Sequence, residues 1–441
     1  MSVHPFAIHN YRAYWIARFA STLASLSMVV VIGWQVYDIA RQTMGVRQAA
    51  FQLGLVGLAQ FLPLLALSLV AGWVADRLDR RLIIRLGIAL EVVCALTLAW
   101  LTASGRITLP SLFGVAALLG VGRAFVGPAQ QALAPNLVPQ QSLPTAIALS
   151  ALAWQVGSIG GPAMGGYLYA ADHALPYYVS GGLFTLALVM MMLVTPVPRT
   201  NIKTGANPFV QMAEGLRYVR RNRLVLGAIS LDMFAVLLGG ATAMLPIYAR
   251  DILQIGADGL GHLRAAPAVG AVAVALVLSW RPLKRNVGVK MLWSVIGFGV
   301  ATAVFGWAGP LMTGWWGPSM IGHDLAPAVL VSLAALLALG AFDMISVYVR
   351  SSLIQLYTPD AMRGRVGAVS TLFISSSNEL GEARSGFLAA LIGPIVATVG
   401  GGVLAILVTA LWARIFPELR RARNFDPPVN LAEPIPEEMK T

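Results

Sequence analysis

Long apolar runs separated by short polar connections dominate this chain. A membrane-spanning helix needs about 20 mostly apolar residues, and we find twelve such runs in the 441 residues. They cover residues 13–39, 52–75, 82–104, 108–134, 143–170, 175–197, 224–249, 259–280, 288–309, 326–357, 366–391 and 393–416. The pattern therefore predicts an all-α membrane protein with twelve transmembrane helices. An even number of spans places both chain ends on the same side of the membrane.

The composition excludes a water-soluble domain. Apolar residues make up 57% of the chain and charged residues only 11%, whereas soluble domains carry about 25% charged residues. Lys and Arg exceed Asp and Glu by 31 to 19, but cytoplasmic loops of membrane proteins are basic in any case, so the excess does not indicate nucleic acid. The single cysteine, Cys94, excludes an intrachain disulfide and a cysteine-based metal site.

The basic residues are distributed asymmetrically between the two sides. With a cytoplasmic N-terminus, the inner segments hold 22 Lys and Arg residues and the outer ones hold five, namely Arg41, Arg47, Arg106, Arg250 and Arg264. The positive-inside rule then predicts that both termini are cytoplasmic.

An internal repeat divides the chain into two halves. At an offset of 220 residues, Gly161 and Gly166 of the fifth run match Gly381 and Gly386 of the eleventh. Parallel repeats of this kind are typical of one large class of secondary transporter. We expect a six-helix bundle over 1–197, a cytoplasmic linker over 198–223, a second six-helix bundle over 224–416 and an unstructured cytoplasmic tail over 417–441.

The linker contains a segment with apolar residues at helical spacing. Phe209, Met212, Leu216 and Val219 alternate with arginines over residues 208–221. This pattern predicts an amphipathic helix on the inner leaflet. A dedicated receptor for a lipid or a protein is the alternative interpretation.

The connection between the second and third runs has an unusual order. It reads Gly72-Trp-Val-Ala-Asp76-Arg77-Leu-Asp-Arg80-Arg81. A glycine that permits close helix approach precedes an acid at the membrane edge and then a basic cluster. This order resembles the signature loop of the major facilitator superfamily. The resemblance implies a cytoplasmic gate, and we assign to it Gly72, Asp76, Arg77, Arg80, Arg81, Arg363 and Arg365.

Further segments extend the resemblance along most of the chain. Residues 33–38, 58–63, 231–237, 359–366 and 378–382 are similar to the branch of the superfamily that contains the enterobactin exporter and related drug exporters. The resemblance implies a multi-pass exporter of the bacterial inner membrane that is coupled to protons. The second-half counterpart of the signature loop, residues 280–285, lacks the acidic residue, so an Asp-centred gate would belong to the first half alone.

Several ionisable residues fall inside the runs, where each charge costs about 2.5–3.5 kcal/mol even on the lowest scale. As proton-coupling candidates we select Asp343, Glu379, Glu382, Asp232, Glu91 and Asp38. The alternative is that they form structural ion pairs, with Arg350 or Arg384 as neutralising partners. Arg123 either pairs with Glu91 or meets an anionic substrate. As candidates for the substrate cavity we select Arg123, Arg350, Trp34, Phe61, Trp154 and Phe373, although ordinary packing explains each aromatic residue as well.

Motifs of catalysis are missing from the sequence. It contains no Walker A motif, no zinc-protease motif and no nucleophile elbow. We therefore expect no enzyme and no cofactor or metal. The sequence favours a monomeric secondary active transporter, in which a proton-coupled exporter moves siderophore-like or drug-like amphipathic small molecules by alternating access. A lipid or lysolipid flippase, or an importer, on the same fold is the alternative.

Overall fold

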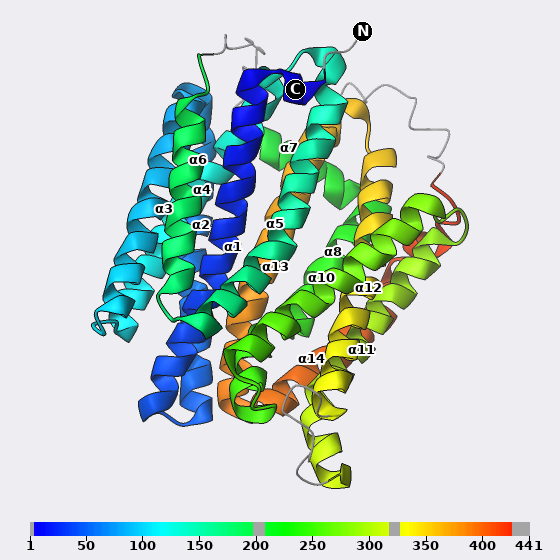
Figure 1. The fold of residues 1–441 in the computed structure, drawn as a ribbon. Helices are drawn as coiled ribbons and strands as arrows, with labels where there is room; N and C mark the ends of the chain where they lie inside the picture. The colour runs from blue at the N-terminus through cyan, green and yellow to red at the C-terminus, as the bar shows by residue number, and fades with distance from the viewer. Residues whose placement is uncertain (1–3, 197–207, 317–326, 426–441) are drawn as a thin grey trace.

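The computed structural model describes residues 4–196, 208–316 and 327–425, and within these ranges it contains helices and no β-strand (Figure 1). The long helices are α1 (His9–Thr43), α2 (Val46–Arg77), α3 (Arg80–Ala103), α4 (Leu109–Leu133), α5 (Leu143–Ala171), α6 (Leu175–Met192), α8 (Arg223–Gly239), α10 (Gly256–Trp280), α11 (Val287–Trp316), α12 (Pro327–Leu356), α13 (Asp360–Ile392) and α14 (Pro394–Ile415). Short helical segments are η1 (Pro5–Ala7), η2 (Ala134–Leu137), η3 (Gln140–Ser142), α7 (Pro208–Arg221), η4 (Thr242–Met244), α9 (Leu245–Ile247), η5 (Tyr248–Ile252) and α15 (Pro417–Arg421).

Helices α1 to α6 run alternately up and down the molecule (Figure 1). The end at which α1 begins also holds the start of α3 with Arg80, Arg81 and Arg85, and we call it the basic end. The opposite end, where α1 ends and α2 begins, is called the far end. Figure 1 shows the start of α1 at the top of the molecule.

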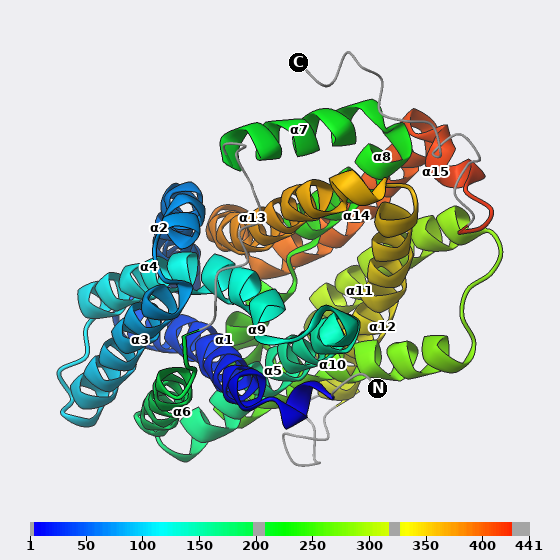
Figure 2. The same ribbon diagram turned by 90° about the horizontal axis from the view of Figure 1, so that it is seen from above.

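Ten helical segments in the described part of the chain are long and apolar enough to cross a membrane. The two further expected spans correspond to α5 and α13, which lie among the others (Figure 2). The number twelve stays a prediction. Helix α3 shows why a membrane suits these helices: Leu86, Val93 and Trp100 are exposed along one face while Ile84, Ile88 and Leu98 of the other face are buried.

The seventh run, expected as one helix over 224–249, is interrupted. Helix α8 ends at Gly239, and the chain then forms the short 3₁₀ turn η4, the helical turn α9 and the π-helix η5. A Cβ added to Gly240 would lie 2.6 Å from Ser385 Oγ and 3.1 Å from the carbonyl oxygen of Gly381, so the break packs closely against α13. The expected span is present, since Arg223–Ile252 is long and apolar enough to cross a membrane, but its helix is interrupted after Gly239.

The linker helix α7 is not simply a lipid-surface helix. Its side chains Met212, Leu216 and Val219 pack with Met362 and Val366 of α13, so protein covers much of its apolar face (Figure 2). Its arginines Arg217, Arg220 and Arg221 are exposed. The side chain of Phe209 and residues 198–207 lie outside what the structure describes.

The start of the expected unstructured tail is helical. Residues Pro417–Arg421 form α15, with Leu419 fully buried against an apolar cluster that includes Val287 and Met291 of α11. Glu418 pairs with Arg223 at 2.8 Å. The prediction for the tail was wrong for these residues, because one apolar side chain in this polar segment anchors it.

Candidate functional site

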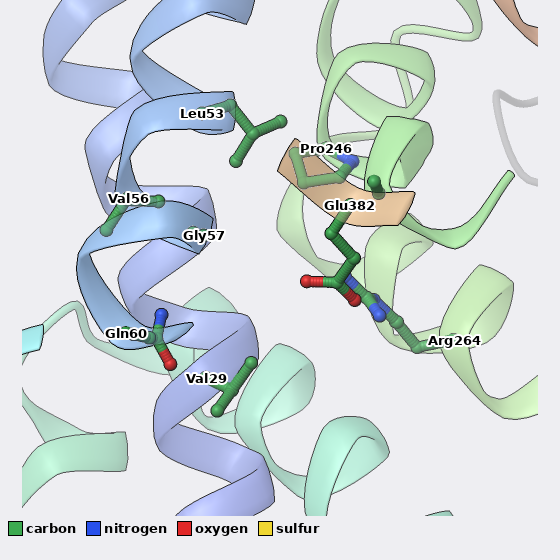
Figure 3. Close-up of a pocket in the computed structure, with 10 residues that line it drawn as sticks. Val29, Leu53, Val56, Gly57, Gln60, Pro246, Arg264 and Glu382 are labelled. Atoms are coloured by element: carbon green, nitrogen blue, oxygen red, sulfur yellow. The ribbon is translucent and has the colours of Figure 1, made fainter. Parts of the chain in front are cut away.

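A small cavity lies between helices from the two halves of the chain (Figure 3). Its volume is about 30 Å³, and it is lined by Val29, Gly33, Leu53, Val56, Gly57, Gln60, Ala243, Pro246, Arg264 and Glu382. The lining comes from α1 and α2 of the first half and from η4, α9, α10 and α13 of the second. Most of the wall is apolar, so the few polar groups set what the cavity can bind.

Arg264 is a cavity residue that the sequence analysis placed in an outer loop. It is the ninth residue of α10, and its Nε atom is buried without a hydrogen-bond partner in the described structure. Gln60 on α2 is 4% exposed, and its Oε1 also lacks a partner among the described residues. Position 264 falls inside the expected run 259–280, and α10 contains it, so its assignment to an outer segment was wrong.

Glu382 and Glu379 lie one turn apart on α13, and Arg123 reaches them from α4. The Nη2 atom of Arg123 lies 3.2 Å from Glu379 Oε1, and both side chains are largely buried. Arg123 therefore pairs with an acid of the other half of the chain and not with Glu91. Glu382 extends toward the cavity that Arg264 also lines (Figure 3).

Glu91 on α3 is 1% exposed. Its Oε1 accepts a long hydrogen bond of 3.4 Å from Ser25 of α1, and its Oε2 has no partner in the described structure. An ionised carboxylate in this position would be costly. The environment is therefore suited to an acid that holds a proton.

Asp232 and Arg350 form an ion pair between α8 and α12, and both side chains are almost fully buried. Arg350 is consequently committed to Asp232 and leaves Asp343, about two helical turns earlier on α12, with no ion-pair partner among the described residues. The alternative in which Arg350 neutralises Asp343 was wrong. This pair joins two helices of the second half, which is the geometry of a structural lock.

Arg384, which was considered as a neutralising partner for the buried acids, instead binds backbone carbonyl groups. Its Nη1 donates to the carbonyl oxygens of Leu237 at 2.9 Å and Leu238 at 2.6 Å. These carbonyls lie directly before the break at the end of α8. A helix break at membrane depth is tolerated only where its freed backbone groups find new partners, so Arg384 stabilises the break and does not neutralise an acid.

Two ion pairs link the halves at the far end. Arg250 of η5 pairs with Asp38 of α1, and Asp251 of η5 pairs with Arg41 of α1 at 2.8 Å. Tyr37 of α1 also donates its hydroxyl to Asp251. The break in the seventh span places Arg250 and Asp251 of η5 beside α1. Because these pairs join the two halves, the far end is closed in this structure.

The signature loop at the basic end is described in part. Gly72, Asp76 and Arg77 lie in α2, and their side chains are outside what the structure describes. Asp79 caps α3 by accepting from the Arg81 backbone N–H at 2.9 Å, and its Oδ2 lies 2.6 Å from Arg81 Nη2. These hydrogen bonds hold the pKa of Asp79 below its usual 3.8.

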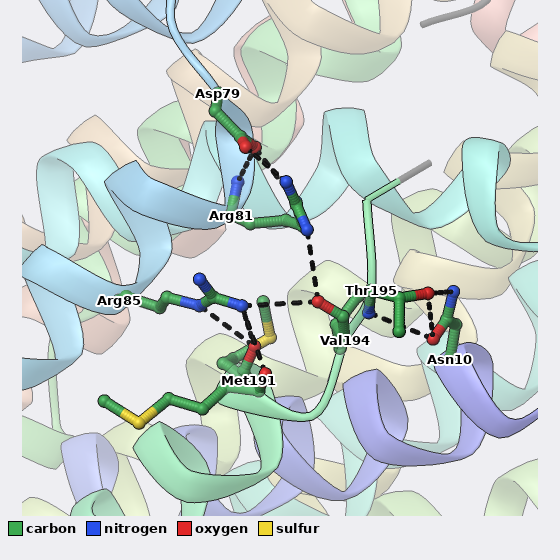
Figure 4. Close-up of polar contacts among 8 residues, drawn as sticks. Asn10, Asp79, Arg81, Arg85, Met191, Val194 and Thr195 are labelled. Atoms are coloured by element: carbon green, nitrogen blue, oxygen red, sulfur yellow. Dashed lines mark hydrogen bonds and ion pairs between the residues drawn. The ribbon is translucent and has the colours of Figure 1, made fainter. Parts of the chain in front are cut away.

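Arginines of this loop also fix the end of α6 (Figure 4). Arg81 and Arg85 both donate to the carbonyl oxygen of Val194, at 3.2 Å each. Arg80 is half-buried at the start of α3.

The two arginines expected at the gate from the second half have partners in that half and in the linker helix α7. Arg363 donates to the carbonyl oxygens of Gln355 and Thr358. Arg365 pairs with Glu214 of α7 at 2.5 Å.

The aromatic candidates differ in their surroundings. Trp34 is 5% exposed and packs edge-on against Tyr169, and Phe61 is 2% exposed. Phe373 packs at the edge of the apolar cluster under α7. Trp154 is 51% exposed. None of the four lines the small cavity.

Within the described ranges no group of three or more His, Cys, Asp or Glu side chains is arranged to hold a metal ion.

A family model for transmembrane secretion effectors matches residues 1–439. The chain belongs to this family. The enterobactin exporter EntS of Shigella boydii serotype 18 is 26% identical over 437 residues, which cover 98% of this chain and 97% of that protein. The chain therefore resembles the branch of the major facilitator superfamily that residues 33–38, 58–63, 231–237, 359–366 and 378–382 indicated, and that prediction is confirmed.

Solved structures share the fold of this secretion effector at low sequence identity. A bacterial homologue of the lysosomal transporter Spinster, in an inward-facing and unoccupied conformation, gives a TM-score of 0.67 at 14% identity and covers 93% of this chain and 98% of that one. A D-xylose–proton symporter gives 0.65 at 14% identity, with 95% and 99% covered. The all-α major facilitator fold is confirmed, and the chain is a membrane transporter and not an enzyme.

Proposed function

We propose that this secretion effector is a proton-coupled exporter of amphipathic small molecules in the bacterial inner membrane. The observation that carries the proposal is the ion pair between Arg123 of the first half and Glu379 of the second, one turn from Glu382 at the cavity. A charge pair that joins the two halves must break when they separate, and it can therefore link protonation to movement.

Alternating access follows from this arrangement. The units that rock are the six-helix bundles 1–197 and 224–416, joined by the linker 198–223. The closed far end, held by Asp38, Arg41, Arg250 and Asp251, faces the periplasm, and the basic end with both termini faces the cytoplasm. In this conformation, substrate would enter from the cytoplasm.

The acids divide into two groups by their partners. Glu382 lines the cavity, Glu379 pairs across the halves, and Glu91 and Asp343 have no ion-pair partner among the described residues. We assign proton binding to this group. Asp232 and Asp38 each hold an arginine, which assigns Asp232 to stability and Asp38 to the far-end gate.

The gate at the basic end is assigned to Asp76 with the loop arginines Arg77, Arg80 and Arg81. Closure of that end would bring Asp76 toward the start of α13, where Arg363 and Arg365 lie. Asp76→Asn is then expected to slow transport while ligand affinity changes little. Lost binding with unchanged inward and outward populations would contradict this gate.

The substrate is an amphipathic small molecule, siderophore-like or drug-like in character. A relative that matches nearly the whole chain is named an enterobactin exporter, and the cavity wall is mostly apolar with a few charged groups. The opposite direction of transport, or a lipid substrate, would show in the same assay.

The test uses purified protein in liposomes. We expect an imposed pH gradient to drive uptake of a fluorescent amphipathic dye into liposomes by the transporter molecules whose cytoplasmic side faces outward. Glu382→Gln, Glu379→Gln or Asp343→Asn is expected to abolish gradient-driven movement while one-for-one exchange at equal pH persists. Asp258→Asn, an exposed acid on α10, is the matched control and is expected to behave like wild type.

Two results would overturn the proposal. If all three variants retain full gradient-driven movement, protons bind elsewhere or do not drive transport. If labelled lysolipid crosses the vesicle membrane faster than the dye, the protein is a lipid flippase.

A further inference from the structure

The polar groups of the small cavity form a dipole. Arg264 contributes a positive charge from α10, and Glu382 of α13 and Gln60 Oε1 of α2 contribute acceptors. Two of these groups have unused hydrogen-bonding capacity: Arg264 Nε as a donor and Gln60 Oε1 as an acceptor, both buried and without partners among the described residues. Unmade hydrogen bonds in a buried site are costly, and a ligand that makes both would gain that energy.

The nearest charges do not satisfy these groups. Arg123 is committed to Glu379 at 3.2 Å, so it neutralises the other acid of the cluster. Arg264 forms no ion pair within 4.0 Å among the described residues, and Glu382 likewise forms none. A positive and a negative group thus line one cavity, with their charged ends directed toward each other (Figure 3).

We propose that this cavity receives a dipolar head group of the transported molecule, with an anionic group on Arg264 and a cationic or N–H donor group on Glu382 and Gln60. A zwitterionic α-amino acid on an apolar body has this chemistry. The inference rests on the proposed transport function, since it assigns a substrate class to the same site. A purely anionic substrate would be repelled by Glu382, and a purely cationic one by Arg264.

The size and walls of the cavity fit a head group and not a whole substrate. Its volume of about 30 Å³ leaves room for only a few atoms. Only the tip of a head group fits while the far end is closed. The apolar lining from Val29, Leu53, Val56 and Pro246 would contact the first carbons of the apolar body, which extends beyond the cavity.

Four probes with one apolar body test the inference. They are β-(2-naphthyl)alanine as the zwitterion, its methyl ester as the cation, its N-acetyl derivative as the anion, and the doubly blocked compound as the neutral control. Binding to the full-length protein in detergent is measured by titration calorimetry. We expect the zwitterion to bind at least about tenfold more tightly than each singly blocked probe, because each blocked probe loses one charge-assisted hydrogen bond.

Charge variants then assign each end of the head group. Arg264→Gln is expected to abolish the preference for the zwitterion over the methyl ester. Glu382→Gln is expected to abolish the preference for the zwitterion over the N-acetyl derivative. Gln60→Met, which removes the acceptor, is expected to weaken the zwitterion alone. Arg264→Lys keeps the charge and is expected to restore most of the first preference, which a merely structural role of Arg264 would not predict. Asp258→Asn is the control for a charge removed from α10.

The outcomes separate this inference from the exporter proposal. Equal binding of all four probes, or tightest binding of the cation or the anion, overturns the dipolar site. If the variants change probe selectivity as expected but no pH gradient drives flux, the head-group site stands and the exporter proposal fails. If a pH gradient drives dye flux but all four probes bind equally, the exporter proposal stands and the head-group site fails. Thermal unfolding of each variant identifies any that fails to fold, and in that case Arg264→Lys and Gln60→Met carry the test.

Discussion

Gly386 of α13 crosses Gly54 of α2 so closely that a Cβ added to Gly386 would lie 2.5 Å from the Cα of Gly54. A second crossing has the same character, because a Cβ added to Gly166 of α5 would lie 2.7 Å from the Cα of Gly261 of α10. Gly166 and Gly386 are separated by 386 − 166 = 220 residues, the offset of the internal repeat. The halves thus meet at two repeat-related backbone contacts, both toward the far end.

Gly386→Ala and Gly166→Ala are expected to hinder closure of the far end. Backbone cannot yield easily to a methyl group at these distances, and overpacking costs about 1–3 kcal/mol, enough to shift a conformational equilibrium about fivefold or more. A cysteine at Gly33, introduced together with Cys94→Ala, should then react faster with a membrane-impermeant maleimide added from the far side. Gly182→Ala, where an added Cβ meets nothing within 4 Å, should leave the rate unchanged. An unchanged rate in both crossing variants would show that these contacts do not limit closure.

Sequence patterns predicted the positions of the helices far better than the pairing of the buried charged side chains. Runs of apolar residues reveal a membrane helix because bilayer thickness sets their length. The buried charges were equally visible in the sequence. Their pairing was not, since Arg123 meets Glu379 across 256 residues, and only helix packing and rotation decide such contacts.

Two features of the structure differ from the sequence predictions, namely the break after α8 and the burial of Arg264. Each has a signal in the local sequence that does not decide the structure by itself. The break after α8 coincides with Gly239, Gly240 and Pro246, but membrane helices tolerate glycine and proline, so periodicity could not distinguish a break from a continuous helix. Arg264 lies among polar residues close to the end of a run. Its burial depends on α13, which presents Glu382 to the same cavity.

The pair between Asp232 and Arg350 should be a stability element. Asp232→Asn leaves Arg350, 5% exposed, as an unpaired buried charge, and loss of one partner of a buried pair costs about 3–5 kcal/mol. Replacing both residues, with Asp232→Leu and Arg350→Met, should recover most of this loss. Thermal unfolding in detergent measures both. A stable Asp232→Asn that has lost only gradient-driven transport would return Asp232 to the proton-binding group.

The ion pairs at the far end should stabilise the closed state modestly. Arg41 and Asp251 are 23% and 17% exposed, so solvent screens their attraction, and we expect Asp251→Asn to shift the equilibrium toward far-end opening by about 1 kcal/mol. The double exchange Arg41→Asp with Asp251→Arg should restore closure, whereas each single exchange should not. Maleimide labelling at position 33 reports the state. If the double exchange opens the far end as much as Asp251→Asn does, the charges do not hold it through this pair.

Asp79 should contribute a pH-dependent part of stability outside the membrane. Its hydrogen bonds with Arg81 place its pKa below 3.8 in the folded protein, so the unfolded chain takes up the proton first as the pH falls. The contribution is therefore fully present above the unfolded pKa and is lost as the pH falls through the folded one. Asp79→Ala should lower stability by about 1 kcal/mol through loss of the helix cap. The difference from wild type should stay constant between pH 8 and pH 5 and shrink only at lower pH. Asp79→Asn, which can still cap, should lose less, and a difference that already shrinks near pH 6 would point to another group.

Docking of α7 on α13 should depend on Gly215. A Cβ on Gly215 would lie 2.8 Å from the carbonyl oxygen of Arg365, and the adjacent Glu214 pairs with the Arg365 side chain at 2.5 Å. Gly215→Ala should therefore lift α7 from α13 and speed hydrogen exchange over residues 208–221. Glu214→Gln should have a smaller effect, because both charged side chains are about one-third exposed and exposed pairs contribute little. A helix held mainly by the lipid surface would tolerate the added methyl group, since no backbone opposes it there. Unchanged exchange in Gly215→Ala would therefore mean that lipid holds α7 in place.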